Sequence, residues 1–79
     1  MKPYLILNTV RGNRQRYEFD TFDEAKQTAD KMQKRRKNSI TVYKFSHTTA
    51  PDEWRRTSNI YHEIYNTKNE ELRPYDCIV

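Results

Sequence analysis

The spacing of apolar residues changes from segment to segment of this chain, and its clearest stretch is helical. Four apolar residues recur at steps of three and four and form one narrow stripe: Phe22, Ala25, Ala29 and Met32. Thr21 and Glu24 have the spacing of a capping box, in which the Thr hydroxyl accepts a hydrogen bond from a first-turn N–H. The pattern predicts a helix over residues 21–37 whose stripe packs against a sheet or another helix.

Two segments before this helix predict a β-hairpin. Residues 4–10 begin with side chains that are apolar on both faces, which is typical of a central strand. Residues 14–19 alternate strictly and place Tyr17 and Phe19 on one face, as a half-buried strand does. Gly12, which tolerates positive φ, lies between the two segments and favours a tight turn there.

A third strand is predicted directly after the helix. Asn38 is expected to end the helix in a left-handed conformation. Residues 39–45 are rich in β-branched and aromatic side chains, which favour a strand. Alternation gives this strand two apolar faces: Ile40 and Val42 on one, Tyr43 and Phe45 on the other. The strand can lie parallel to the second strand or beside the first in either sense, and the sequence does not decide between these arrangements.

The C-terminal part carries weaker signals. Residues 51–56 begin with Pro and two acids and predict a short helical turn. Residues 59–65 favour a fourth strand, although a helix from Ser58 also fits their spacing. Residues 70–72 are a candidate hairpin partner, and residues 75–79 a short terminal strand. A strand at 59–65 would set three side chains on one face: Tyr61, Glu63 and Tyr65.

Together these elements predict a single α+β domain over residues 1–79. Its core is ββαβ, with one helix on one face of a mainly antiparallel sheet and two further short C-terminal strands. The chain has 34% hydrophobic residues and 13% aromatic residues, so its core should be thin and rich in rings.

Positive charge is concentrated in the first part of the chain. The net charge is +4, but residues 1–45 hold eleven Lys or Arg and five acids, whereas residues 46–79 hold four and six. This asymmetry predicts one face that attracts polyanions.

Enzyme and metal signatures are missing from the sequence. One Gly cannot form a glycine-rich phosphate loop, and Cys77 alone cannot form an intramolecular disulfide or a Cys-rich zinc site. His47 and His62 have no ligand-type spacing. The N-terminal segment resembles neither a signal peptide nor a membrane span. We therefore expect a non-enzymatic, cytoplasmic protein without catalytic residues, metal or cofactor and without a membrane partner.

The favoured hypothesis is nucleic-acid binding through one basic patch. The helix should run back across the hairpin, which would bring its C-terminal cations near the arginines of the hairpin turn. Such a patch could neutralise several phosphates, while an exposed Tyr on the uncovered sheet face could stack on bases, unless the second half of the chain covers it. A basic helix end also stabilises the helix without any ligand. The predicted nucleic-acid residues are Arg11, Arg14, Arg16, Lys31, Lys34, Arg35, Lys37 and Tyr43.

The alternative hypothesis is a protein-binding regulator or inhibitor of the kind that phages and mobile elements encode. Exposed aromatic and Arg side chains dominate interface hot spots, and on that ground the sequence offers four candidates: Trp54, Arg55, Tyr61 and Tyr65. The sequence is also compatible with a homodimer.

Overall fold

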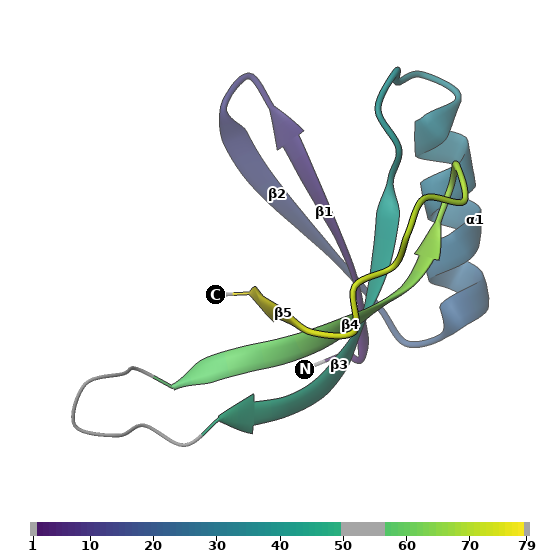
Figure 1. Ribbon diagram of the computed structural model, residues 1–79. Coiled ribbons are helices and arrows are strands. Elements are labelled where there is room, and N and C mark those ends of the chain that lie inside the picture. The colour runs from purple at the N-terminus through teal and green to yellow at the C-terminus, as the bar shows by residue number, and fades with distance from the viewer. Residues whose placement is uncertain (1, 50–56, 79) are drawn as a thin grey trace.

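The computed structural model describes residues 2–49 and 57–78. These form one helix and a five-stranded sheet (Figure 1). In chain order the elements are β1 (Tyr4–Val10), β2 (Asn13–Phe19), α1 (Phe22–Gln33), β3 (Thr41–Thr49), β4 (Ser58–Asn66) and β5 (Asp76–Ile78). The predicted α+β class, with one helix on a mainly antiparallel sheet and two C-terminal strands, is confirmed.

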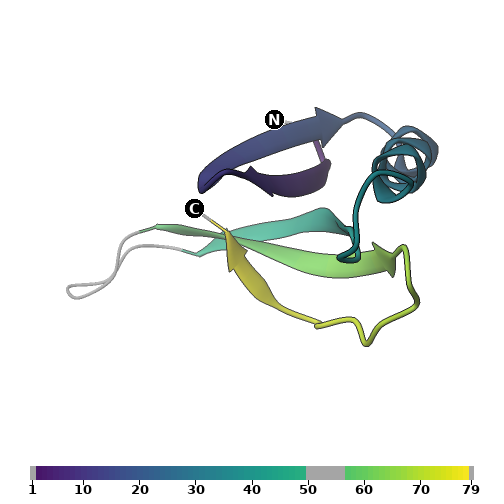
Figure 2. The same cartoon turned by 90° about the horizontal axis from the view of Figure 1, so that it is seen from above.

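The strands lie in the order β2-β1-β3-β4-β5, and every neighbouring pair is antiparallel. The third strand therefore lies beside the first, which settles an orientation that the sequence left open. β1 pairs with β3 only from Tyr4 to Ile6 and then diverges from it. Because of this divergence the sheet curls, and in Figure 2 the β1–β2 hairpin forms a layer of its own over β3, β4 and β5.

The predicted apolar stripe of α1 packs on the sheet. Ala25 and Ala29 are fully buried against Ile6, Ile40 and Val42. Two small side chains on the helix let its backbone approach the strands closely, and larger residues close the rim of this core: Tyr4, Phe19, Phe22, Met32, Ile64 and Tyr65. The face predicted for Ile40 and Val42 is confirmed.

A second core fills the other face of the curled sheet. Leu5, Tyr61 and Ile78 are buried there, and Phe45 meets the Tyr61 ring edge-on with centroids 5.5 Å apart. Tyr61 is only 1% exposed, so the prediction that it offers an exposed ring is wrong. The second half of the chain supplies β4 and β5, which cover this face, and burying an aromatic ring there stabilises a thin core.

A shift in pairing between β3 and β4 sends Tyr65 to the helix side. Val42 pairs with Tyr65, whereas Tyr43 pairs with Glu63, so Ile64 is the extra residue of a β-bulge. Strict alternation had placed Tyr61, Glu63 and Tyr65 on one face. The bulge breaks the alternation, and Ile64 and Tyr65 both pack against the helix-side core.

The helix ends earlier than predicted. Its last residue is Gln33, and the chain then tightens, because Arg35 N donates to Met32 O at 3.2 Å and Arg36 N donates to Gln33 O at 3.1 Å. The Gln33 side chain also donates to Arg36 O at 2.9 Å. Asn38 is not among the described residues with positive φ, so the predicted left-handed cap is wrong.

Other boundaries also differ. β3 begins at Thr41 and extends to Thr49, and residues 70–72 are not a strand, so the predicted hairpin partner is wrong. The strand predicted over residues 59–65 is confirmed as β4. The helical turn predicted over residues 51–56 lies outside the described residues. The first hairpin turns at Arg11 and Gly12, both with positive φ, which is the conformation of a two-residue turn that matches strand twist.

Candidate nucleic-acid interface

Positive side chains gather where α1 ends. In Figure 1 the C-terminal end of α1, the β1–β2 turn and the turn after β4 lie at the same end of the molecule. The Lys68 ammonium, from the turn after β4, donates to the backbone oxygen of Lys37 and ties the two segments together. We call the resulting group of cations the helix-end patch: Lys31, Lys34, Arg35, Arg36, Lys37 and Lys68.

Carboxylates do not neutralise this patch in the part of the chain that the structure describes. The ion pairs found there are Lys2 with Asp20 at 3.8 Å and Arg16 with Glu18 at 3.7 Å. No member of the helix-end patch has a described carboxylate at ion-pair distance. The patch is therefore a site of uncompensated positive charge that faces solvent.

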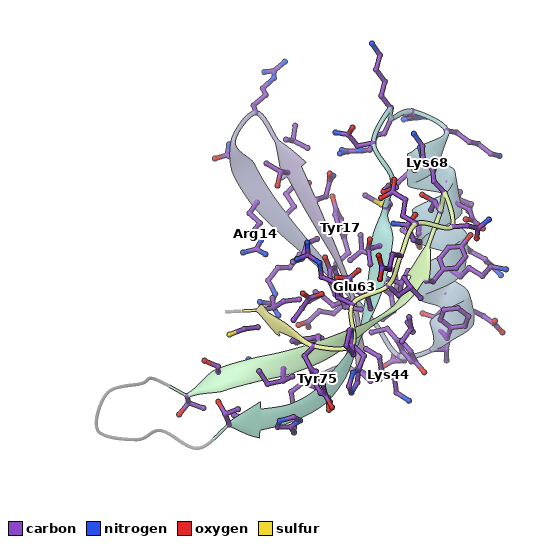
Figure 3. The ribbon with its side chains drawn as sticks, viewed as in Figure 1. Arg14, Tyr17, Lys44, Glu63, Lys68 and Tyr75 are labelled. Carbon is purple, nitrogen blue, oxygen red and sulfur yellow. The ribbon has the colours of Figure 1, made fainter. Side chains whose placement is uncertain are left out.

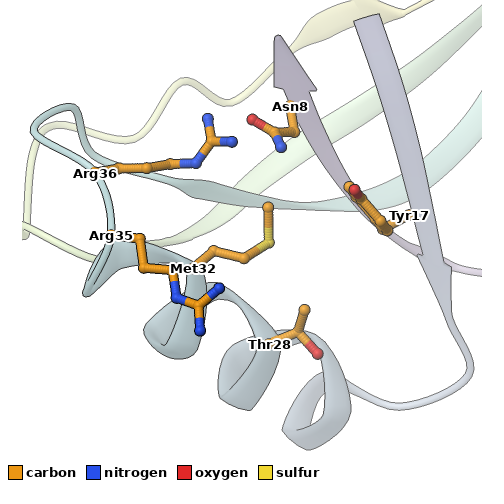
Figure 4. Close-up of a pocket in the computed structure, with 6 residues that line it drawn as sticks. All are labelled: Asn8, Tyr17, Thr28, Met32, Arg35 and Arg36. Carbon is orange, nitrogen blue, oxygen red and sulfur yellow. The ribbon is translucent and has the colours of Figure 1, made fainter. Parts of the chain in front are cut away.

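A pocket of about 430 Å³ opens between the hairpin and the last turns of α1 (Figure 4). We call it the hairpin–helix pocket. Asn8 and Tyr17 line it from the strands, Thr28 and Met32 from the helix, and Arg35 and Arg36 from the segment after the helix. Its lining combines two guanidinium groups with an amide, a ring and a thioether.

Asn8 is a buried polar residue whose side chain points into this pocket. It is 6% exposed, and no described residue hydrogen-bonds its amide. Figure 4 shows that amide directed toward the guanidinium of Arg36. Arg36 is half-buried, and its guanidinium has neither a hydrogen bond nor an ion pair with the described residues. Two groups on the same pocket thus offer hydrogen bonds that no described residue uses.

The Tyr17 ring forms the strand side of the pocket. Its hydroxyl donates to Gln15 Oε1 at 2.7 Å, which orients the ring. Tyr17 is 37% exposed, and Met32 lies across the pocket on α1. A ring and a thioether provide an apolar surface of the kind on which flat ligands rest.

Arg14 and Arg16 lie on the other face of the sheet. Opposite residues of an antiparallel pair share a face, and Arg14 pairs with Thr9 while Arg16 pairs with Leu7, whose side chain belongs to the second core. Arg16 is also paired with Glu18. In Figure 3, Arg14 on the hairpin is well separated from Lys68 beside the end of α1. The structure does not bring these arginines together with the helix end.

Arg11 is placed differently from the other two hairpin arginines. It lies in the β1–β2 turn, at the same end of the molecule as the helix-end patch, but does not line the pocket.

Tyr43 lies near carboxylates rather than in the patch. It packs against the second core, and its pKa is raised by burial and then by Glu63 and Asp76. The pKa of Glu63 is itself raised, first by burial and then by interaction with Asp76. Arg14 and Arg73 also act on Tyr43, so the charges around it are mixed rather than uniformly positive as in the helix-end patch.

The residues of the protein-binding alternative do not form an exposed surface within the described chain. Trp54 and Arg55 lie outside the described residues. Tyr61 is buried, and the Tyr65 ring packs edge-on against Phe22 at 6.2 Å. The Tyr65 hydroxyl donates to Asp30 Oδ1 at 2.6 Å, and this bond is the first cause of its raised pKa.

The predicted set lacks six residues of the helix-end patch and the hairpin–helix pocket: Asn8, Tyr17, Thr28, Met32, Arg36 and Lys68. Asn8 carried a usable signal, because it is a polar residue in an otherwise apolar strand segment. Alternation in residues 14–19 predicts that Tyr17 shares a face with Phe19, but it does not show that the ring lines a pocket, which depends on the divergence of β1 from β3. Lys68 is distant in sequence and reaches the patch only through the pairing of β3 with β4.

Comparisons of the chain with protein-family models, with curated proteins and with solved structures found no match. Within the described residues, no helix is long and apolar enough to cross a membrane. The same residues contain no group of three or more His, Cys, Asp or Glu arranged to hold a metal ion.

Proposed function

We propose that this protein is a non-enzymatic nucleic-acid-binding module that holds phosphates at the helix-end patch. The observation that carries the proposal is the set of cations at one end of the molecule with no described carboxylate at ion-pair distance. Lys and Arg that neutralise phosphates release condensed counterions, which is the main source of sequence-independent affinity for nucleic acids.

Helix stabilisation alone does not account for this patch. The macrodipole acts within the last turn of a helix, and Lys31 is the basic residue in the last turn of α1. Arg35, Arg36 and Lys37 follow the C-cap residue Lys34 and lie beyond the helix. Like charges placed side by side repel one another, so an anionic ligand would remove an unfavourable interaction as well as add a favourable one.

The proposed interface differs from the predicted one in its extent. It retains Lys31, Lys34, Arg35 and Lys37 and adds Arg36 and Lys68, whereas Arg14, Arg16 and Tyr43 lie on the other face of the sheet. Arg11 lies in the β1–β2 turn, at the same end of the molecule as this patch, and we propose that it contacts a longer strand of nucleic acid.

A triple substitution tests the proposal. Replacing Lys34, Arg35 and Lys37 with Ser should weaken binding of oligonucleotides of unrelated sequence on the order of tenfold or more at low salt, because three phosphate contacts are lost. Fluorescence anisotropy with labelled single-stranded and duplex oligonucleotides measures this loss.

A matched variant separates local contacts from net charge. Replacing Lys2, Lys26 and Lys44 with Ser removes the same charge from exposed positions elsewhere in the first half of the chain. This control should bind nearly as well as the unmodified protein. Equal weakening by the two triple variants, or no binding of any oligonucleotide at low salt, would contradict the proposal.

The protein-binding alternative remains a hypothesis. Its strongest anchor, Trp54, lies outside the described residues, and a partner captured through Trp54 rather than through the patch would favour it.

A further inference from the structure

The hairpin–helix pocket contains polar groups that the fold leaves unused. The Asn8 amide and the Arg36 guanidinium open onto this pocket, where a ligand can reach both groups. Asn8 and Arg36 line the same pocket, and neither has a hydrogen-bond partner for its side chain among the described residues. Both groups can donate, and the Asn8 amide can also accept.

We infer that the hairpin–helix pocket holds one unpaired nucleotide of a single-stranded nucleic acid. This inference rests on the proposed function and adds to it the form of the ligand. Arg35 and Arg36 bind the phosphate, and the base lies between the Tyr17 ring and Met32. Asn8 hydrogen-bonds to the edge of the base.

The composition of the pocket favours a nucleotide over a bare phosphate. A phosphate needs cationic and N–H donors, which Arg35 and Arg36 supply. A bare phosphate has no use for the apolar surface of Tyr17 and Met32, whereas a base stacks on such a surface. The side-chain amide of an Asn carries a donor and an acceptor side by side, which matches the paired groups on the edge of a base. The volume of about 430 Å³ fits a small ligand of this size.

The same geometry favours single strands. In a duplex the bases are stacked and paired, and a side chain can reach only their groove edges. A base that enters a pocket between a hairpin and a helix must first leave its stack, which costs least in a single strand. The helix-end patch attracts single strands and duplexes alike through their phosphates. The pocket adds a base contact that only single strands make.

An isosteric substitution with three probes tests this inference. Asn8→Leu removes both hydrogen-bonding groups at nearly constant volume. The probes are a twelve-nucleotide oligo(dT), a duplex of the same length and polyphosphate, all at one salt concentration. The unmodified protein should bind oligo(dT) most tightly of the three probes. Asn8→Leu should lower the affinity for oligo(dT) on the order of tenfold, because the base contact is lost. Its affinities for the duplex and for polyphosphate should stay unchanged.

A second variant keeps the charge. Arg36→Lys retains the positive charge but loses the planar fork, so oligo(dT) affinity should fall while the salt dependence of binding stays the same. Arg73→Lys makes the same chemical change on the face that carries Tyr43 and Glu63 and should have no effect. Circular dichroism establishes that each variant is folded.

The outcomes separate the inference from the proposed function. Suppose that the Ser variant of Lys34, Arg35 and Lys37 loses binding, whereas Asn8→Leu and Arg36→Lys bind as the unmodified protein does. Then the pocket holds no nucleotide, and the proposed function stands. Equal affinity for oligo(dT) and polyphosphate would likewise overturn the inference alone. If no probe binds at low salt, both fail. A nuclear magnetic resonance titration with thymidine monophosphate gives a direct readout, since the Asn8 side-chain amide signals should shift more than with inorganic phosphate.

Discussion

Glu63 is a residue whose carboxyl group the fold makes harder to ionise. It pairs with Tyr43 across the strands of the second core and lies near Asp76 on β5. Burial and the neighbouring carboxyl raise its pKa, and Arg73 opposes them only in part, first through a backbone hydrogen bond and then through its positive charge. One oxygen of Asp76, Oδ2, is buried without a hydrogen-bond partner in the described structure. Ionisation of Glu63 therefore works against folding.

The raised pKa sets the direction of a pH effect. The folded state holds the Glu63 proton more tightly than the unfolded state, so the stability that this group contributes is present below its unfolded pKa and is lost as pH rises through the folded pKa. Glu63→Gln, which resembles the protonated form, should raise the free energy of unfolding at pH 7 and lose this advantage toward pH 4. Urea unfolding at pH 7 and pH 4 measures the difference in free energy of unfolding between Glu63→Gln and the unmodified protein. An equal difference at both pH values would show that ionisation of Glu63 is not its cause.

At the scale of an element, α1 owes its N-terminus to a local signal in the sequence. Thr21 has an extended backbone, and its hydroxyl accepts a hydrogen bond from Glu24 N at 3.3 Å. The hydrogen bond predicted for the Thr21 hydroxyl of the capping box is thus confirmed. Asp23 and Glu24 in the first turn also complement the helix macrodipole.

Removing this cap should destabilise the domain. Thr21→Ala should lower the free energy of unfolding by about 1 kcal/mol, because the Glu24 N–H loses its acceptor, whereas Thr21→Ser should cost much less. Thermal or urea unfolding of the two variants measures the difference. Equal stability of the Ala and Ser variants would mean that the hydroxyl does not support the helix.

The elements that local patterns specify were predictable, and those that depend on pairing were not. The apolar stripe at Ala25 and Ala29 and the two faces of β3 follow from spacing within one segment. The bulge at Ile64 depends on which residues of β3 and β4 face each other, and alternation within β4 contains no trace of it. It alone moves Tyr65 from one face of the sheet to the other.

The candidate site was predictable to the same degree. The cations from Lys31 to Lys37 are close in sequence, so they lie close together in space wherever the helix ends. Whether the arginines of the hairpin join them depends on pairing register, and the register of β1 with β2 turns Arg14 and Arg16 away. The pocket depends on the divergence of β1 from β3, which no local pattern encodes.

At the scale of the whole molecule, the curled sheet separates two electrostatic environments. The face with Tyr43 carries Glu63, Asp76 and Arg14, where opposite charges lie near one another. The end of the molecule beyond α1 carries the helix-end patch, without described carboxylates at ion-pair distance. Positive charge is therefore available to a ligand at one end, although the net charge of the chain is only +4.

The salt dependence of oligonucleotide binding tests this claim most directly. Each phosphate that a protein contacts on a single strand contributes about 0.7 to the slope of log affinity against log salt concentration, so full use of the helix-end patch should give a slope of about −4. Replacing Lys34, Arg35 and Lys37 with Ser should reduce its magnitude by about 2, for the same reason. A slope near zero, or one that the triple substitution leaves unchanged, would show that these cations do not bind phosphates.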